Sequence, residues 1–207
     1  MSKRLSWVLA SFVCAVSDGQ ELGQTAAKEI ALPLTADFQG WHFEGARDCW
    51  TLQDGVIVGK NNAKKSGSIL WTDAVVQDFV FSCQYKLTDG GDSGVFLREE
   101  NEQIQLGVSR SLNVDMSGAP YIASKKGYPV AAVGVGKLLK ANDWNHLEIT
   151  VRGSHYWVKL NDKQVLDFVS DRQPLKASGS VGLQLHPGVE MEVQFRQVSL
   201  KSLPPTP

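Results

Sequence analysis

Cysteine and histidine are scarce in this chain of 207 residues, which has three cysteines and four histidines. It contains no CxxC pair and no histidine-rich run, so the sequence gives no support to a zinc site. Cys49 and Cys83 lie within the body of the chain, and they form either a disulfide or two buried free thiols. Their spacing alone does not decide between these two states.

An excess of one charge is also missing. The chain has 21 lysines and arginines against 22 aspartates and glutamates, for a formal net charge of −1. Neither sign forms a long block, so the sequence does not indicate a nucleic-acid groove or a surface for anionic membranes. We therefore expect no nucleic-acid partner.

Long hydrophobic runs are absent, and the apolar run from Leu5 to Val16 is too short for the ~20 residues that span a bilayer. Lys3 and Arg4 precede this run, and Ala15-Val16-Ser17 places small residues at the positions that a signal peptidase reads. The pattern predicts a signal peptide over residues 1–17, no transmembrane segment, and a secreted or periplasmic protein.

The residues after this signal have the length of one domain. Cys14 offers an alternative as a lipoprotein attachment site, but the preceding Ser11-Phe12-Val13 matches such a signal poorly. We predict a flexible lead-in over residues 18–36, a folded domain over 37–203, and a Pro-rich tail over 204–207.

Sustained helical periodicity is missing as well, whereas short β-rich runs bounded by turn residues recur along the chain. These runs cover residues 55–59, 79–87, 94–98, 104–108, 145–152, 155–160, 163–169, 179–185 and 193–200. The pattern predicts an all-β fold, specifically an antiparallel β-sandwich.

Alternation within one of these runs predicts which face meets the core. In residues 145–152, Leu147, Ile149 and Val151 fall on one side of an extended strand and polar residues on the other. The pair Asn161-Asp162 then predicts a hairpin turn, because both residue types tolerate left-handed backbone conformations.

The longest irregular stretch covers residues 109–142, which are interrupted by several glycines and prolines. Tyr121, Lys125, Lys126 and Tyr128 concentrate hydrogen-bonding groups there. Because long loops in compact domains are often functional, we favour a substrate-facing loop with Tyr121 and Lys125 in contact with substrate. The alternative is an inserted loop that packs on the surface.

Paired carboxylates, which a retaining glycosidase needs about 5 Å apart, are not evident. The acidic cluster at residues 99–102 follows a strand in a turn, and Glu190 and Glu192 are more typical of a solvated strand edge. Ordinary glycoside hydrolysis is therefore not our first interpretation.

Several short motifs occur in an order that resembles the 3-keto-disaccharide hydrolase family over residues 38–203. They are Asp37-Phe38-Gln39-Gly40-Trp41, Trp50 to Ile57, Asp92 to Arg98, Gln103-Ile104-Gln105-Leu106 and Gly182-Leu183-Gln184-Leu185-His186. The resemblance implies a jelly-roll sandwich of the concanavalin A-like lectin and glucanase type. Gln103 departs from the family pattern, which has a glutamate there.

The resemblance also implies cleavage of glycosides whose C3 hydroxyl has been oxidised to a ketone. The ketone acidifies the C2 proton, so a base can form an enolate that expels the C1 oxygen, and water addition completes a net hydrolysis. Such chemistry needs a base and an oxyanion stabiliser. We predict a hydrolase or lyase acting on a 3-keto-disaccharide or related glycoside.

Two residues are the candidate catalytic groups. His186 is the candidate base, because imidazole titrates near neutral pH, although a lone histidine is also a common structural residue. Arg98 is the candidate enolate stabiliser, and the alternative is an ion pair with an acid at the edge of the sandwich.

Substrate binding is assigned to a polar stripe and to aromatic side chains. Gln103 and Gln105 point the same way along one strand, as Gln184 and His186 do along another, which predicts a sugar-binding sheet face. Trp71 is a further candidate, with a groove and a core position both open, and Tyr121 is another because sugar C–H faces stack on aromatic rings.

No resident cofactor is predicted. Asp92 and Asp115 are conceivable ligands for a divalent cation acting as a Lewis acid, but no dense Asp-rich loop accompanies them. Two alternative functions stay open. The first is a noncatalytic carbohydrate-binding module, which Gln103 in place of a carboxylate favours, and the second is a structural or interaction domain of the cell envelope.

Overall fold

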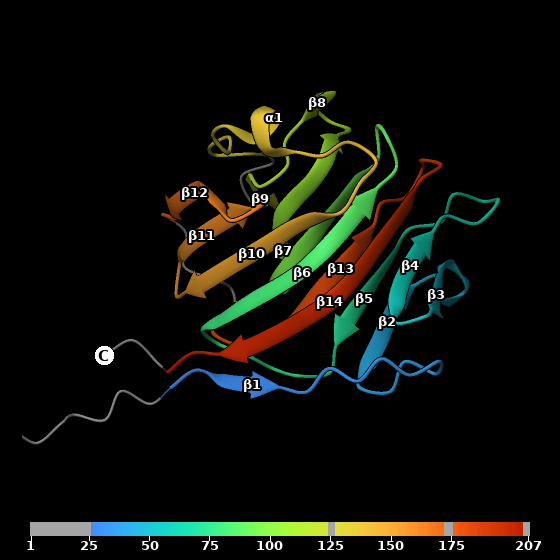
Figure 1. The fold of residues 1–207 in the computed structure, drawn as a ribbon, viewed down its shortest axis with the longest axis horizontal. Coiled ribbons are helices and arrows are strands. Elements are labelled where there is room, and N and C mark those ends of the chain that lie inside the picture. Colours follow the sequence, from blue (N-terminus) through green and yellow to red (C-terminus); the bar gives the residue numbers. More distant parts are fainter. Residues whose placement is uncertain (1–25, 124–126, 172–175, 205–207) are drawn as a thin grey trace, which may run out of the picture.

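A computed structural model describes residues 26–123, 127–171 and 176–204 of the chain. Two antiparallel sheets pack face to face, and Figure 1 shows them as two layers, with β6 and β14 in one and β7 and β13 in the other. The predicted antiparallel β-sandwich is confirmed. The predicted signal peptide lies outside the described residues. In the described ranges, no helix has both the length and the apolar character to cross a membrane.

The first sheet has eight strands among the described residues, in the order β12-β11-β10-β6-β14-β4-β3, with β1 also paired to β14. The strands are β1 (Lys28–Ile30), β3 (Trp50–Gln53), β4 (Val56–Lys60), β6 (Phe79–Leu87), β10 (Asn145–Arg152), β11 (His155–Leu160), β12 (Lys163–Val169) and β14 (Glu192–Ser202). A short 3-10 helix, η1 (Arg47–Cys49), precedes β3.

The second sheet has the order β2-β5-β13-β7-β8 in the described chain, with β9 paired to β7. The strands are β2 (Trp41–Gly45), β5 (Ser68–Thr72), β7 (Asp92–Ser109), β8 (Val114–Asp115), β9 (Pro120–Ile122) and β13 (Ser180–Leu185). A one-turn helix, α1 (Val135–Leu138), lies in the connection from β9 to β10.

The long strand β7 doubles back on itself. The Val108 amide donates to the Gly91 carbonyl at 2.8 Å, and a side chain at Gly94 would meet the Gln103 Oε1 atom at 2.9 Å. The first arm pairs with β13 and the second arm pairs with β9. The sequence predicts the two arms as separate runs, at 94–98 and 104–108, with a turn at 99–102, and does not predict that they fold back on each other.

The core fills the space between the two inner faces. Leu147, Ile149 and Val151 are each at most 1% exposed, as their alternation predicts. They belong to one continuous apolar cluster with residues of both sheets, such as Phe81 of β6 and Leu183 of β13. Continuous burial of this kind is the main favourable contribution to folding.

The two described cysteines are free thiols in this core. Cys49 is 3% exposed and Cys83 is 1% exposed, and neither forms a disulfide. Desolvation by burial raises the pKa of the Cys83 thiol far above its ordinary range. Of the two states that the sequence leaves open, the structure therefore has the free thiols.

The Asn161-Asp162 hairpin is confirmed, since both residues have positive φ angles, 48° and 65°, between β11 and β12. The structure differs from expectation at β1, which lies inside the segment 18–36 predicted as a flexible lead-in. β4 covers only part of the long strand β14, and β1 pairs with the remainder through Ile30 and Leu200. Strand pairing thus orders a short segment that shows no period of its own.

Candidate functional site

Side chains of four neighbouring strands form rows across the outer face of the second sheet. His42 of β2 is paired with Trp71 of β5, Trp71 with Gly182 of β13, and Gly182 with Phe96 of β7. Directly opposed residues in antiparallel strands point to the same side of a sheet. Leu70 and Leu183, which alternate with this row, are fully buried in the core, so the row faces outward.

Two glycines hollow this outer face. A Cβ atom at Gly182 would lie 2.6 Å from the Trp71 ring, and one at Gly94 would lie 2.9 Å from the Gln103 Oε1 atom. Side chains at these two positions would therefore displace the Trp71 ring and the Gln103 amide. The glycines let the Trp71 ring and the Gln103 amide lie close against the strands.

A cavity of about 370 Å³ opens on this face. It brings together five residues that the sequence analysis assigns to catalysis or substrate binding: Gln103, Gln105, Tyr121, Gln184 and His186. The other lining residues are Asp92, Phe96, Glu100, Ser109, Arg110, Ser111 and Tyr128. The predicted polar stripe on two strands is thus assembled into one site.

A directed chain of hydrogen bonds lies in the wall of this cavity. Gln103 Nε2 donates to Gln105 Oε1 at 3.1 Å, and Gln105 Nε2 donates to Asp92 Oδ1 at 2.7 Å. Asp92 also accepts a hydrogen bond from the Arg110 amide at 3.0 Å. The three side chains that form these hydrogen bonds are buried: Gln103 is 6% exposed, Gln105 is 1% exposed and Asp92 is 3% exposed.

The carboxylate of Asp92 fixes the direction of this chain. An ionised carboxylate only accepts hydrogen bonds, so Gln105 must present its NH₂ group to Asp92 and its oxygen to Gln103. Gln103 must then donate to Gln105 through its NH₂ group, so the Oε1 atom of Gln103 receives no hydrogen bond from Gln105 or Asp92. Among the buried atoms of the described residues, Gln103 Oε1 and Gln184 Oε1 both lack a hydrogen-bond partner.

His186 lies at the rim of the same cavity. Its Nδ1 atom is 2.7 Å from the Pro187 carbonyl oxygen, which can only accept, so the proton of the neutral ring resides on Nδ1. The lone pair is therefore on Nε2, which lies 3.9 Å from Asp92 Oδ2. The His186 side chain is 32% exposed, so its ring is accessible from the cavity.

Two tyrosines cover one side of the cavity. Tyr121 on β9 lies opposite Gln103 in register, and its ring meets that of Tyr128 edge-on at 5.2 Å. Burial, together with the nearby Asp92 carboxylate, raises the pKa of Tyr128 to about 12. The Tyr128 hydroxyl therefore keeps its proton well above neutral pH and can donate a hydrogen bond.

Arg98 does not join these residues. It has a positive φ angle of 67°, and its guanidinium points to the end of the core, where it donates to the carbonyl oxygens of Gly153 at 2.7 Å and Gln77 at 3.3 Å. Its Nη2 atom is 3.9 Å from Glu102 Oε2, and both side chains are 1% exposed. This geometry favours the ion-pair interpretation of Arg98 over enolate stabilisation.

Trp71 lies on the same sheet face but lines a second cavity, of about 380 Å³. Its indole donates to Glu44 Oε2 at 2.9 Å, and its ring packs against Phe96 with centroids 5.5 Å apart. Phe96 lines the first cavity, so the two rings lie between the two cavities. Lys125, the remaining predicted contact, lies outside the described residues.

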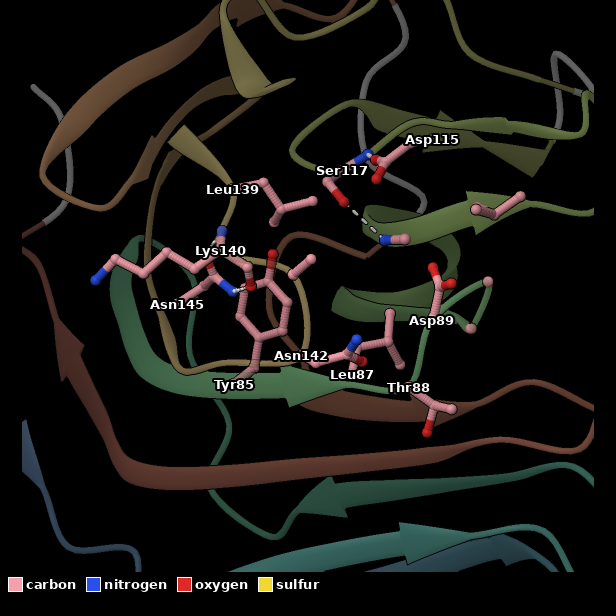
Figure 2. Close-up of a pocket in the computed structure, with 15 residues that line it drawn as sticks. Tyr85, Leu87, Thr88, Asp89, Asp115, Ser117, Leu139, Lys140, Asn142 and Asn145 are labelled. Atoms are coloured by element: carbon pink, nitrogen blue, oxygen red, sulfur yellow. Dashed lines mark hydrogen bonds between the residues drawn. The ribbon is translucent and has the colours of Figure 1, made fainter. Parts of the chain in front are cut away.

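The two candidate cation ligands are separated. Asp92 lines the first cavity, whereas Asp115 lines a small cavity of about 80 Å³ near β6 and β10. Figure 2 shows Asp115 and Ser117 on one side of the small cavity, across from Tyr85 and Asn145. Asp115 Oδ1 accepts from the Ser117 amide at 2.8 Å. Within the described chain, no three or more acidic, histidine or cysteine side chains cluster in a way that could hold a metal ion.

Sequence reasoning did not assign Asp92, Phe96 or Tyr128 to the sugar site. Asp92 enters it because β7 folds back and brings residue 92 beside Gln105. Gly94 and Gly182 lie inside two predicted strands, and a glycine within a strand often marks a close approach of other groups. Their positions could therefore have indicated this face as a site. Tyr128 lies in the stretch predicted to face substrate, but its role was left open.

Two comparisons of sequence give different results. The model of a family described as 3-keto-alpha-glucoside-1,2-lyase-like domains matches residues 35–201. No curated protein matches the chain. The family match spans both sheets and includes all twelve residues that line the first cavity.

Solved structures with a similar fold include proteins of different kinds. A candidate glycosyl hydrolase from Parabacteroides distasonis is 22% identical, with a TM-score of 0.62 over 81% of this chain and 95% of its own. The carbohydrate-binding module CBM66 from Bacillus subtilis is 17% identical, with a TM-score of 0.54 over 82% and 100%. A Bacillus subtilis protein with a galectin-like fold is 12% identical, with a TM-score of 0.63 over 87% and 100%. These likenesses confirm the predicted lectin-like sandwich.

Proposed function

The chain belongs to the family of 3-keto-alpha-glucoside-1,2-lyase-like domains, and from this premise we propose that it cleaves the glycosidic bond of 3-keto-glycosides in its first cavity. The family supports a carbohydrate-processing enzyme in general terms. The specific reaction is our proposal, and the pairing of a histidine lone pair with unpartnered amide oxygens in one cavity is the observation that carries it.

His186 Nε2 is the proposed base. It takes the proton from C2, and the C2–H electron pair forms the enolate with negative charge on the C3 oxygen. The enolate then restores the C3 carbonyl and forms a C1–C2 double bond, while the C1–O bond breaks and the leaving oxygen takes up a proton. Addition of water across the double bond yields the net hydrolysis product. Asp92 at 3.9 Å stabilises the imidazolium that forms after proton transfer.

Tyr128 is the proposed hydrogen-bond donor to the enolate oxygen. It lines the same cavity as His186, and burial raises its pKa from the ordinary 10 to about 12, so it is a neutral donor well above neutral pH. A neutral donor in a partly shielded cavity stabilises developing negative charge more than water does. Arg98, the donor expected from the sequence, is replaced in this role because its guanidinium is engaged in the core.

The two amide oxygens supply the binding contacts. Gln103 Oε1 and Gln184 Oε1 are buried acceptors without a donor in the described structure, and a sugar hydroxyl offers the donor that each one lacks. An unsatisfied buried polar group costs about 1–3 kcal/mol. A ligand that satisfies both oxygens therefore recovers this cost on binding.

The decisive experiment follows cleavage of 3-keto-trehalose and 3-keto-lactose beside the unoxidised sugars, with and without a chelator. We expect the oxidised sugars to be cleaved and the unoxidised sugars to be left intact. Loss of activity with chelator would add a metal ion to the mechanism. Absence of cleavage in every arm would overturn the proposal.

A noncatalytic carbohydrate-binding module is the second candidate. Gln103 in place of the family's glutamate favours it, because an amide cannot act as a general base. The same cavity would then bind an unmodified sugar through the two amide oxygens. Sugar binding without turnover of either 3-keto substrate would select this function.

A further inference from the structure

The second cavity adjoins the first on the same sheet face and has a different chemical character. Trp71 and Phe96 pack together over Gly182 and form a low aromatic ridge between the two cavities. Glu100 lines both cavities, so they adjoin beside this ridge. A ligand longer than one sugar ring, seated in the first cavity, can therefore extend across the ridge.

Three glutamates line the second cavity. Glu44 and Glu100 are exposed on its lining, and Glu99 also borders it. The Trp71 indole orients Glu44 by donating to Oε2 at 2.9 Å, which leaves Oε1 free of that contact. Lys176 and His42 are exposed basic side chains on the same lining, and His42 pairs with Asp73 at 2.7 Å. Arg98 also lines this cavity, with its guanidinium turned toward Glu102 at 3.9 Å.

We infer that the second cavity takes the leaving-group portion of the glycoside, and that this portion is a hydroxyl-rich group without negative charge. This inference rests on the proposed function, because the oxidised ring is assigned to the first cavity by the position of His186. Carboxylate oxygens accept hydrogen bonds from sugar hydroxyls. They also repel an anionic group, and an apolar aromatic group would desolvate them without returning a hydrogen bond.

A matched pair of leaving groups tests this inference. 3-Keto-lactitol and 3-keto-lactobionate share the oxidised galactosyl ring and an open-chain leaving group of equal length, and they differ in the carboxylate of the second. We expect KM for the lactobionate derivative to be about 5-fold higher at low salt, with the difference shrinking in 0.5 M NaCl because exposed charges are screened.

Glu44→Gln is the test variant. A glutamine keeps an oxygen that can accept from the Trp71 indole and removes only the charge, so the ratio of the two KM values should fall to about 2 or less. Glu148→Gln is the matched control, because Glu148 lies on the first sheet and pairs with Lys159 at 2.8 Å. The control should keep the ratio of the unsubstituted protein. An unchanged ratio in Glu44→Gln would overturn the inference.

Calorimetric binding of unoxidised lactitol and lactobionate separates this inference from the proposed reaction. A preference for lactitol that Glu44→Gln abolishes, without turnover of the 3-keto compounds, would support the second cavity and overturn the catalytic proposal. Turnover of both 3-keto compounds with equal KM would support the catalytic proposal and overturn the inference about the second cavity. Absence of both binding and turnover would overturn both.

Discussion

The outer faces of the two sheets carry similar polar side chains but satisfy them differently. On the first sheet, the polar groups pair with one another across neighbouring strands. These pairs are Lys159 with Glu148 at 2.8 Å, His155 with Asp167 at 2.6 Å and Arg196 with Gln84 at 2.8 Å. On the second sheet, the chain of hydrogen bonds from Gln103 ends at Asp92 and leaves the Gln103 and Gln184 oxygens without partners.

The polar groups described on the first sheet find their hydrogen-bond partners within the protein. On the second sheet, we expect a ligand to supply the partners that two amide oxygens lack. Glycine contributes to the difference, since Gly94 leaves the space in which the Gln103 amide lies and Gly182 leaves the space in which the Trp71 ring lies. Polar residues of similar type can therefore have different functions on the two faces. Their hydrogen-bond partners, and not their identity alone, indicate which face binds a ligand.

The largest effect on stability should come from Arg98, which lies beside the hollow face but points into the core. Arg98→Ala removes the cationic partner of the buried Glu102 carboxylate, which keeps its hydrogen bond from Tyr156, and also removes two hydrogen bonds to backbone carbonyls. We expect a loss of about 3–5 kcal/mol in the free energy of unfolding, measured by urea denaturation. Arg196→Ala, on the outer face of the first sheet, should cost far less. Unchanged stability with a selective loss of turnover would restore Arg98 to a catalytic role.

His186→Ala should reduce turnover of 3-keto-lactose by about 100-fold or more, because a general base contributes factors of this order. The melting temperature should stay close to that of the unsubstituted protein, since the ring is about one-third exposed and packs at the cavity rim. His146→Ala on the first sheet is the matched control and should retain turnover. Full activity in His186→Ala would remove His186 as the base.

Gly182→Ala tests whether the hollow depends on a missing side chain. The added methyl would lie 2.6 Å from the Trp71 ring, which is held between Phe96 and Glu44 and cannot move freely. We expect a destabilisation of about 1–3 kcal/mol in thermal or urea unfolding. Gly136→Ala is the control, because no atom lies within 4 Å of a side chain added there. Equal behaviour of the two variants would contradict this view of the face.

Gln184→Ala should weaken sugar binding by about 3- to 10-fold, which corresponds to the loss of one hydrogen bond between neutral groups. The measurement is calorimetric titration with the sugar that the unsubstituted protein binds. Gln194→Ala removes a glutamine from the first sheet, where its amide donates to Glu192 at 2.6 Å. If both variants lose affinity equally, the two outer faces do not differ in the way we describe.

The smallest effect belongs to Lys159→Ala. Its hydrogen bond to Glu148 raises the pKa of Lys159, but the side chain is exposed to solvent. An exposed pair of this kind contributes little to stability, so the melting temperature should stay within the error of the measurement. A clear drop would show that the paired surface of the first sheet stabilises the fold beyond our expectation.

Much of the fold follows from alternation in the sequence, and the failures have identifiable causes. The bounds predicted for β6, β10, β11 and β12 agree with the structure, because each of them has turn residues at its ends. β5 was missed, since four of its five residues are buried and it shows no alternation. β2 was missed although it alternates, with Trp41 and Phe43 toward the core and His42 and Glu44 exposed.

The site was predictable only in part for a similar reason. The shared face of Gln103 and Gln105 follows from spacing along one strand, and their roles in binding stay predictions. The position of Asp92 depends on the fold-back of β7, and the turn of Arg98 into the core depends on a left-handed backbone angle at an arginine. Neither feature leaves a local signal, because each is imposed by contacts between distant residues.

The pairing of β1 with the end of β14 also has a mechanical consequence. Lys28 lies opposite Ser202, so the first and last described strands run side by side with their outer ends together, as Figure 1 shows. A force that pulls these two ends apart would break the pairing of β1 with β14 one residue pair at a time. It would not have to break all the pairs at once, as shearing the strands along their length would. Tension on the polypeptide would therefore be released at this edge of the first sheet before it reached the cavities of the second.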